Sequence, residues 1–162
     1  MKDLSHFDAS GKIKMVDISE KEPSVRRAIA SAKVLLLPET LNILRSQPNP
    51  KGNPLEIARI AGIMGAKKTS ELIPLCHQIN LSNVNVTAEF RDFGVYLESE
   101  AVTNAQTGVE MEALAAVSIA ALTVYDMCKA VQKDIVITDI RLERKTGGKT
   151  DFSRSDLTER ES

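Results

Sequence analysis

The sixteen residues Val84–Ser99, VNVTAEFRDFGVYLES, decide which fold the sequence predicts. Apolar and polar side chains alternate over Val84–Ala88 and again over Val95–Ser99. Alternation with a period of two is typical of a strand with one buried face. The turn Asp92–Gly94 between the two runs is short and contains glycine, so the whole stretch is predicted to form a β-hairpin.

The segments on either side of the hairpin complete the pattern. In chain order they are a strand within Ala28–Leu37, a short helix from Pro38, a buried helix over Leu55–Gly65, a long helix after Thr107 to about Val131, and a strand over Ile135–Leu142. The order strand, helix, hairpin, helix, strand is the βαββαβ arrangement of ferredoxin-like folds. We therefore predict an α+β fold with an antiparallel four-stranded sheet and its helices on one face.

Two features of this fold concern its partners and its long helix. The sheet face without helices is expected to be hydrophilic or buried by a partner, and the apolar long helix also invites partners, so we predict an oligomer. Thr107 and Glu110 have the spacing of a capping box, which places Thr107 at the helix cap and Glu110 three positions further on.

Length and composition set the class of protein. The 162 residues suit one domain, predicted over 1–162 with flexible segments at 1–14 and 151–162. The 21 basic and 22 acidic residues give a net charge of -1, and the aromatic residues are only four Phe and two Tyr. A protein that binds nucleic acid would be more basic and would offer more stacking platforms. No nucleic-acid partner is therefore expected.

Cysteine usage and hydropathy indicate the compartment. The two cysteines, Cys76 and Cys128, form no CxxC pair, which argues against a zinc ribbon or a thioredoxin-type redox site, and two cysteines are too few for a disulfide scaffold. The longest nearly apolar run, Ala113–Tyr125, has 13 residues, whereas a membrane span needs about 20. The first residues lack the apolar segment of a signal peptide. A cytoplasmic protein with no membrane partner is expected.

Three groups of residues are candidates for chemistry. His77, beside Cys76, belongs to the residue type best suited to acid–base work near pH 7, but a buried histidine bonded to the backbone is the more common outcome. Glu110 and Glu112 point about 200° apart on a helix and cannot serve one site in one subunit. Glu110 suits the cap and Glu112 is freer for function, or both simply complement the helix N-terminus.

Asp126 and Lys129 lie on one face of the long helix, three residues apart. They form either a solvated ion pair or, if buried, a pair with shifted pKa values suited to proton transfer. Asp126 follows Glu112 by 14 residues, which corresponds to about 21 Å along a helix. Either the two have separate duties, or the site is assembled from two subunits.

Basic residues gather in irregular segments rich in glycine. They include Arg26, Arg27, Lys51, Lys67, Lys68, Lys145 and Lys149. Such loops suit phosphate groups, although each lysine alone is explained by solubility. The stretch Gly148–Thr150 ends like a P-loop, but Glu143 stands where the first glycine belongs and no helix follows, so that motif is rejected.

Seven segments together resemble the MoaC family, the cyclic pyranopterin monophosphate synthases of molybdenum cofactor biosynthesis. They are Met15–Ser19, Ala58–Gly62, Ala66–Thr69, Leu72–His77, Thr107–Leu114, Ala121–Ala130 and Gly147–Lys149. The blocks IPLCH and GVEMEAL are the most specific of them. The resemblance runs from about residue 5 to residue 152.

The resemblance implies a reaction, an assembly and a set of site residues. The reaction is the lyase-type conversion of (8S)-3′,8-cyclo-7,8-dihydroguanosine 5′-triphosphate to cyclic pyranopterin monophosphate (a molybdopterin precursor) with release of pyrophosphate. The assembly is a homohexamer, a trimer of dimers with active sites between subunits. The implied catalytic residues are Asp126, Lys129 and Lys51. The implied substrate-binding residues are Leu75, Cys76, His77, Met111, Glu112, Arg26 and Lys149.

No cofactor is required by this reading, and magnesium bound with the triphosphate is compatible with it. The residues leave two other classes of protein to consider. A ferredoxin-like sensor of small nucleotides would explain the fold and the lysines but not the pairing of Asp126 with Lys129. An RNA-binding sheet would need exposed aromatic residues on its central strands, whereas Phe90, Phe93 and Tyr96 cluster at the hairpin turn.

Overall fold

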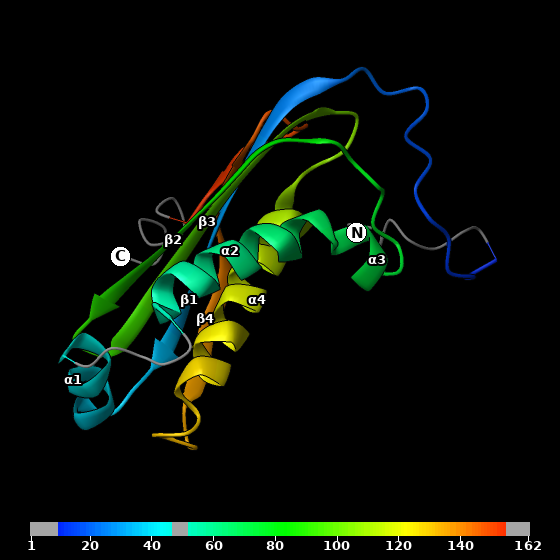
Figure 1. Ribbon diagram of the computed structural model, residues 1–162. Coiled ribbons are helices and arrows are strands. Elements are labelled where there is room, and N and C mark those ends of the chain that lie inside the picture. The colour runs from blue at the N-terminus through cyan, green and yellow to red at the C-terminus, as the bar shows by residue number, and fades with distance from the viewer. Residues whose placement is uncertain (1–9, 47–51, 155–162) are drawn as a thin grey trace, which may run out of the picture.

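The computed structural model describes residues 10–46 and 52–154. The elements (Figure 1) are β1 (Ser24–Leu35), α1 (Pro38–Ser46), α2 (Pro54–Lys67), α3 (Thr69–Leu72), β2 (Leu81–Arg91), β3 (Gly94–Ala105), α4 (Glu110–Cys128), β4 (Val136–Thr146) and β5 (Phe152–Ser153). The predicted order of strand, helix, hairpin, helix and strand is confirmed. Of the segments predicted to be flexible, residues 1–9 and 155–162 lie outside the described residues.

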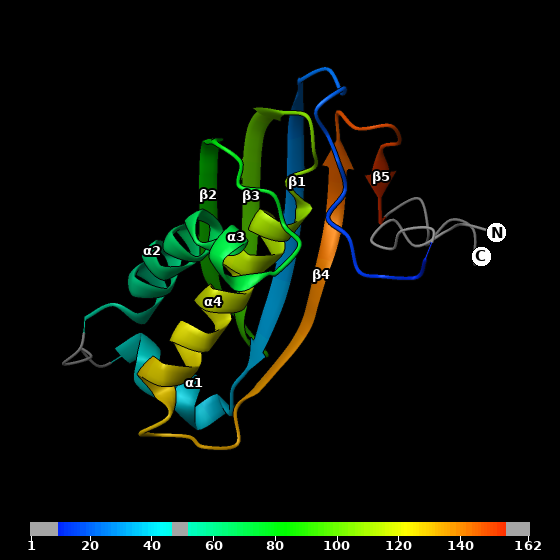
Figure 2. The same cartoon turned by 90° about the vertical axis from the view of Figure 1, so that its right-hand side faces the viewer.

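The strands form one antiparallel sheet in the order β2-β3-β1-β4-β5 (Figure 2). The first four occupy the positions expected of a ferredoxin-like sheet, and β5 adds a short fifth strand to the four predicted. The hairpin turns where glycine is required. Gly94 has φ +138°, and a Cβ there would lie 2.1 Å from the carbonyl oxygen of Val34.

The helices α2 and α4 cover one face of the sheet, as predicted (Figures 1 and 2). They lie close together because α2 has small residues where they meet. A Cβ on Gly62 would lie 2.9 Å from the carbonyl oxygen of Ala116, and one on Gly65 would lie 2.7 Å from Cγ1 of Ile119. This tight contact builds the layer above the sheet.

The core lies between α4 and the sheet. Alternate residues of β1, from Ala28 to Val34, have no exposed surface and face the helices. By length and composition α4 is long and apolar enough to cross a membrane, with a mean hydropathy of 1.4. It is the only such helix in the described part of the chain, and half of that apolar window is buried inside the domain. The central helix of a packed core has the same composition.

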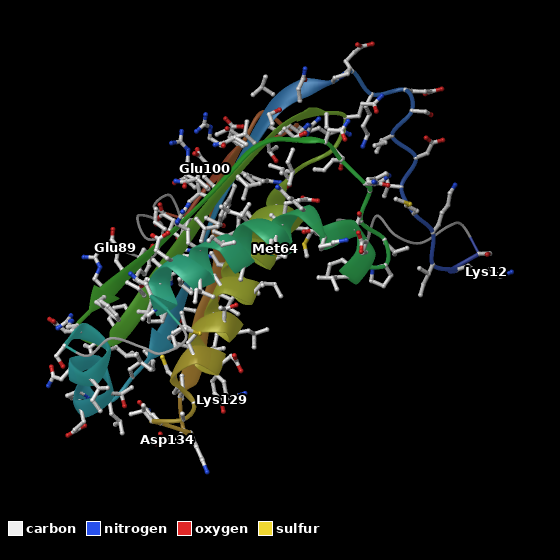
Figure 3. All side chains as sticks on the ribbon, viewed as in Figure 1. Lys12, Met64, Glu89, Glu100, Lys129 and Asp134 are labelled. Atoms are coloured by element: carbon white, nitrogen blue, oxygen red, sulfur yellow. The ribbon has the colours of Figure 1, made fainter. Side chains whose placement is uncertain are left out.

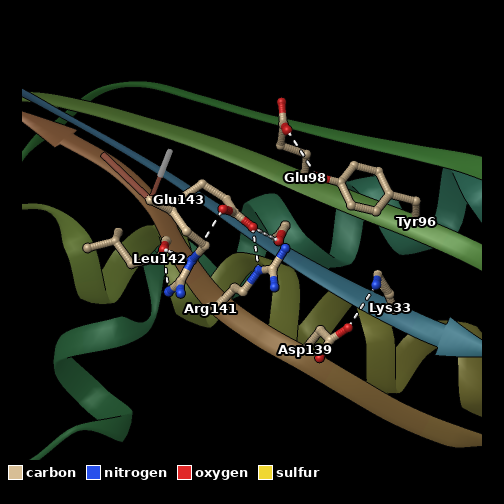
Figure 4. A network of polar contacts seen from close by, with 9 residues as sticks. Lys33, Tyr96, Glu98, Asp139, Arg141, Leu142 and Glu143 are labelled. Carbon is tan, nitrogen blue, oxygen red and sulfur yellow. Dashed lines mark hydrogen bonds and ion pairs between the residues drawn. The ribbon is translucent and has the colours of Figure 1, made fainter. Parts of the chain in front are cut away.

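The face of the sheet without helices is hydrophilic (Figures 3 and 4). An ion pair joins β1 to β4, with Lys33 Nζ 2.8 Å from Asp139 Oδ2. Within β4, Arg141 Nε lies 2.7 Å from Glu143 Oε1. Ser31, although buried, also donates to Glu143. Of the two outcomes expected for this face, the structure of the single chain shows the hydrophilic one.

The predicted capping box is wrong. The helix α4 begins at Glu110 itself, its cap is Val109, and no side chain caps it. Glu110 therefore occupies the first helical position instead of the third, and its carboxylate accepts from Lys145 Nζ at 2.9 Å. The helix also ends at Cys128, three residues before the predicted Val131.

Candidate active site

Two pockets adjoin at the end of the sheet where α4 begins. The basic pocket, of about 220 Å³, lies between the start of β1, the loop before α4 and the turn after β4. The histidine pocket, of about 430 Å³, lies between the loop after α3, the start of α4 and the segment before β1. Lys21, Thr107, Gly108 and Glu110 line both pockets, so the two share part of their walls and together form the cleft.

The histidine pocket brings together five predicted binding residues from two distant segments. They are Leu75, Cys76, His77, Met111 and Glu112. The loop that follows α3 is packed against the first turn of α4, which closes the sequence gap between them. The sequence blocks IPLCH and GVEMEAL thus form two walls of one pocket.

His77 both lines the histidine pocket and bonds to the backbone. Its Nε2 lies 2.8 Å from the carbonyl oxygen of Val16. This contact ties the segment before β1 to the loop that carries His77. The backbone-bonded alternative is therefore the one observed in the single chain, although the ring remains half-buried at the pocket wall.

Glu112 is the buried acid of the cleft, with 5% of its surface exposed. Burial raises its pKa from 4.5 to about 6, its own backbone N–H acts in the opposite direction, and the nearby Glu110 raises it further. Burial also raises the pKa of the Cys76 thiol, and the charge of Glu112 adds to that effect. Cys76 is therefore a neutral thiol at neutral pH, whereas Glu112 can gain or lose a proton there.

Cations gather in the basic pocket, where Lys21, Arg26, Arg27, Lys145 and Lys149 contribute to the lining. The side chain of Arg26 also joins β1 to the end of β3, since its Nε donates to the carbonyl oxygen of Ala105 at 3.0 Å. The predicted binding residues Arg26 and Lys149 are thus placed together. Lys21 was missed, because a single lysine in an irregular segment carries no pattern.

Asp126 and Lys129 lie elsewhere, at the other end of α4, where Figure 3 labels Lys129. In their ion pair, Lys129 Nζ lies 2.6 Å from Asp126 Oδ1, and the side chains of Lys129 and Asp126 are 54% and 56% exposed. The hydrogen bond and charge of Asp126 raise the pKa of Lys129, while desolvation acts weakly against this. In the single chain the pair is solvated, so the expected shift by burial does not occur, and neither residue lines either pocket.

Two further predictions concern Lys51 and metals. Lys51 lies outside the described residues. Within residues 10–46 and 52–154, no group of three or more His, Cys, Asp or Glu side chains is arranged to hold a metal ion.

The fold and the joined pockets define a ferredoxin-like α+β domain with a basic cleft at one end of its sheet. The model of the MoaC family matches residues 15–148, which include every element from β1 to β4. The chain belongs to the MoaC family.

Several named relatives are identical to this chain at more than half of the aligned residues. A protein of Streptomyces avermitilis named cyclic pyranopterin monophosphate synthase is 53% identical over 94% of this chain and 90% of its own length. One of the same name from Oleidesulfovibrio alaskensis is 54% identical over 91% and 94%. The molybdenum cofactor biosynthesis bifunctional protein of Chlorobaculum tepidum is 53% identical over 91% of this chain, which spans 47% of that protein.

Proposed function

We propose that the chain is a lyase of molybdenum cofactor biosynthesis that converts (8S)-3′,8-cyclo-7,8-dihydroguanosine 5′-triphosphate to cyclic pyranopterin monophosphate and pyrophosphate. The observation that carries this proposal is the junction of the basic pocket with the histidine pocket. A purine-derived ring needs shape and a few polar groups, whereas a triphosphate needs cations. The family relatives named cyclic pyranopterin monophosphate synthase support the same reaction.

The two pockets suggest how the substrate lies. The ring system occupies the histidine pocket, where Leu75, Cys76, His77, Met111 and Glu112 surround it. The triphosphate extends past Glu110 toward Arg26 and Lys149 in the basic pocket. Closing the cyclic phosphate expels pyrophosphate, and the charge that develops on it is stabilised by these cations.

The proton transfers are assigned to Asp126, Lys129 and Lys51. Opening and rebuilding the ring needs a proton donor and an acceptor, and the Asp126–Lys129 pair supplies one of each. The pair lies 14 residues beyond Glu112, or about 21 Å along α4. We therefore propose that a second subunit brings its own pair to the cleft, within a homohexamer built as a trimer of dimers.

The enzyme needs no resident cofactor, and magnesium would enter only with the triphosphate. A cytoplasmic location suits a biosynthetic enzyme with a small, charged substrate.

Incubation of the purified chain with the cyclic guanosine triphosphate derivative tests the proposal. The expected result is release of pyrophosphate together with a product that oxidises to a fluorescent pterin. Glu56→Gln, on the exposed side of α2, is a matched control that leaves the cleft intact. Tight binding of the substrate by folded protein without pyrophosphate release would instead favour a sensor of small nucleotides.

A further inference from the structure

The chain beyond the family match folds back onto the sheet. The matched region ends at residue 148, but β5 pairs with β4, with Arg144 opposite Ser153 and Lys145 opposite Phe152. Between them runs the turn 147–151, which contributes Gly148, Lys149 and Thr150 to the wall of the basic pocket. The position of that wall therefore depends on what holds the turn at its two ends.

The first end of the turn is fixed by close packing on β1. Gly147 has φ +85°, and a Cβ there would lie 2.0 Å from the carbonyl oxygen of Val25. Ser24 Oγ donates to the carbonyl oxygen of Gly147 at 2.8 Å, and the N–H of Gly147 donates to Asp151 Oδ1 at 3.1 Å. These contacts hold the start of the turn against the mouth of the pocket.

The second end is fixed by Arg154. Its backbone N–H donates to the carbonyl oxygen of Glu143 at 2.9 Å. Its guanidinium donates twice to the carbonyl oxygen of Leu142, from Nε at 3.2 Å and from Nη2 at 3.0 Å. Its Nε also lies 3.4 Å from Glu143 Oε2, and its guanidinium carbon lies 6.0 Å from the ring centroid of Phe152. One side chain thus joins the end of β5 to two consecutive residues of β4.

The acceptors of Arg154 are themselves held in place. The carboxylate of Glu143 accepts from Ser31 Oγ at 2.5 Å and from Arg141 Nε at 2.7 Å (Figure 4). Its side chain is 22% exposed, so these contacts are partly shielded from water. Arg154 therefore attaches β5 to a network that already spans β1 and β4.

We propose that Arg154 is a positioning residue for phosphate binding: by clamping β5 to β4 it holds the turn 147–151, and with it Lys149, at the basic pocket. Arg154 does not line the pocket. The inference rests on the proposed function, because it takes the basic pocket as the site of the triphosphate. It adds a residue outside the family match to the parts that shape that site.

The test compares Arg154→Ala with Arg141→Ala in the full chain. Both variants remove an arginine that contacts Glu143, but only the first releases β5. Pyrophosphate binding is measured by calorimetry, and backbone hydrogen exchange is measured over residues 147–151. For Arg154→Ala we expect the pyrophosphate Kd to rise about tenfold, the effect of losing one hydrogen bond made by a charged group, and the turn to exchange faster. For Arg141→Ala both readouts should match the wild-type protein.

Steady-state kinetics separate the inference from the proposed function. With substrate, Arg154→Ala should raise KM with little change in kcat, because bound substrate still meets the same chemical groups. If the wild-type protein binds pyrophosphate in an Arg154-dependent way but does not turn over the substrate, the proposed function fails and the inference stands. If the wild-type protein is active and Arg154→Ala is unchanged in KM, in Kd and in exchange, the inference fails alone.

Two further outcomes also decide the matter. No binding of pyrophosphate to the wild-type protein, or an equal loss in Arg141→Ala, would overturn the role of Arg154. If Arg154→Ala does not fold by circular dichroism, Arg154→Gln carries the same comparison, because its amide keeps one donor for Leu142 without the charge or the fork.

Discussion

Lys145 Nζ lies 2.9 Å from Oε1 of Glu110, and this ion pair stands where the basic pocket meets the histidine pocket. The two residues come from the end of β4 and the first position of α4. The ion pair joins the end of β4 to the start of α4 at the point where a substrate would pass from one pocket to the other. The side chains are 36% and 27% exposed, so the pair borders the open cleft.

Glu110→Gln should lower the pKa of Glu112. The charge of Glu110 raises that pKa, so its removal favours the ionised form of Glu112. The measurement is an NMR titration of the Glu112 side-chain carboxyl carbon in both proteins. Glu56→Gln, which changes an exposed acid on α2, should leave the titration unchanged. An unaltered Glu112 midpoint in Glu110→Gln would show that the two acids do not interact.

Stability should fall as pH rises through the range in which Glu112 titrates. Its pKa is raised from 4.5 to about 6 by burial, so the folded protein keeps a proton that the unfolded chain releases between these values. This stabilisation is complete below about pH 4.5 and is lost above about pH 6, with a loss of up to about 2 kcal/mol. Urea unfolding at pH 4.5 and 7.5 measures it. Glu112→Gln should lose this component of the pH dependence, and a variant with the wild-type slope would contradict the assignment.

Asp126→Ala and Lys129→Ala should each abolish pyranopterin formation without unfolding the protein. The pair is solvated in the single chain, so thermal unfolding of both variants should match that of the wild-type protein. Loss of a positioned proton donor or acceptor lowers turnover by about 10²–10⁴-fold. The matched control is Arg91→Ala, which breaks an equally exposed ion pair with Glu89 on β2. Wild-type turnover by either variant of the Asp126–Lys129 pair would remove it from the mechanism.

A mixture of Glu112→Ala and Lys129→Ala proteins should recover activity. About 21 Å of helix separates these positions in one chain, so a cleft shared between subunits can be intact when each variant supplies the part that the other lacks. Activity is measured before and after subunit exchange, which mass spectrometry of an isotope-labelled variant verifies. Full exchange with no recovery would mean that one chain supplies the whole site.

Gly62→Ala should destabilise the domain. Alanine favours a helix over glycine by about 1 kcal/mol, but its Cβ would lie 2.9 Å from the carbonyl oxygen of Ala116. That oxygen belongs to the backbone of α4, so the two helices must separate, and overpacking of this kind costs about 1–3 kcal/mol. Urea unfolding should show a net loss of stability. Arg59→Ala, on an exposed part of the same helix, is the control, and a stabilised Gly62→Ala protein would contradict the packing described for α2 and α4.

Much of the fold follows from local sequence patterns. The alternation over Val84–Ser99 identified the hairpin, and the apolar density of Leu55–Gly65 identified α2, because each pattern reflects which face is buried. The prediction of a capping box failed because Thr107 lies in the loop before α4 and Glu110 is the first residue of the helix. The carboxylate of Glu110 is instead held by Lys145, which lies 35 residues further along the chain. Likewise nothing in residues 151–154 indicates a strand, since β5 is held by contacts to β4.

The candidate site divides in the same way. The resemblance to the family named Leu75–His77 and Met111–Glu112 as substrate-binding residues, and the structure brings them into one pocket. The contribution of Lys21 depends on where the segment before β1 crosses the cleft, which has no local signal. Asp126 and Lys129 were recognised as a pair from their spacing, and their distance from the cleft follows from the length of one helix.

The continuity of α4 makes it a spacer with a fixed register. It runs without a break from Glu110 to Cys128, so inserting one residue in its middle would turn Asp126 by about 100° and move it about 1.5 Å relative to Glu112. Insertion of a whole turn would restore the direction but lengthen the spacing by about 5.4 Å. Functional descendants of this chain should therefore keep the number of residues between Glu112 and Asp126 unchanged.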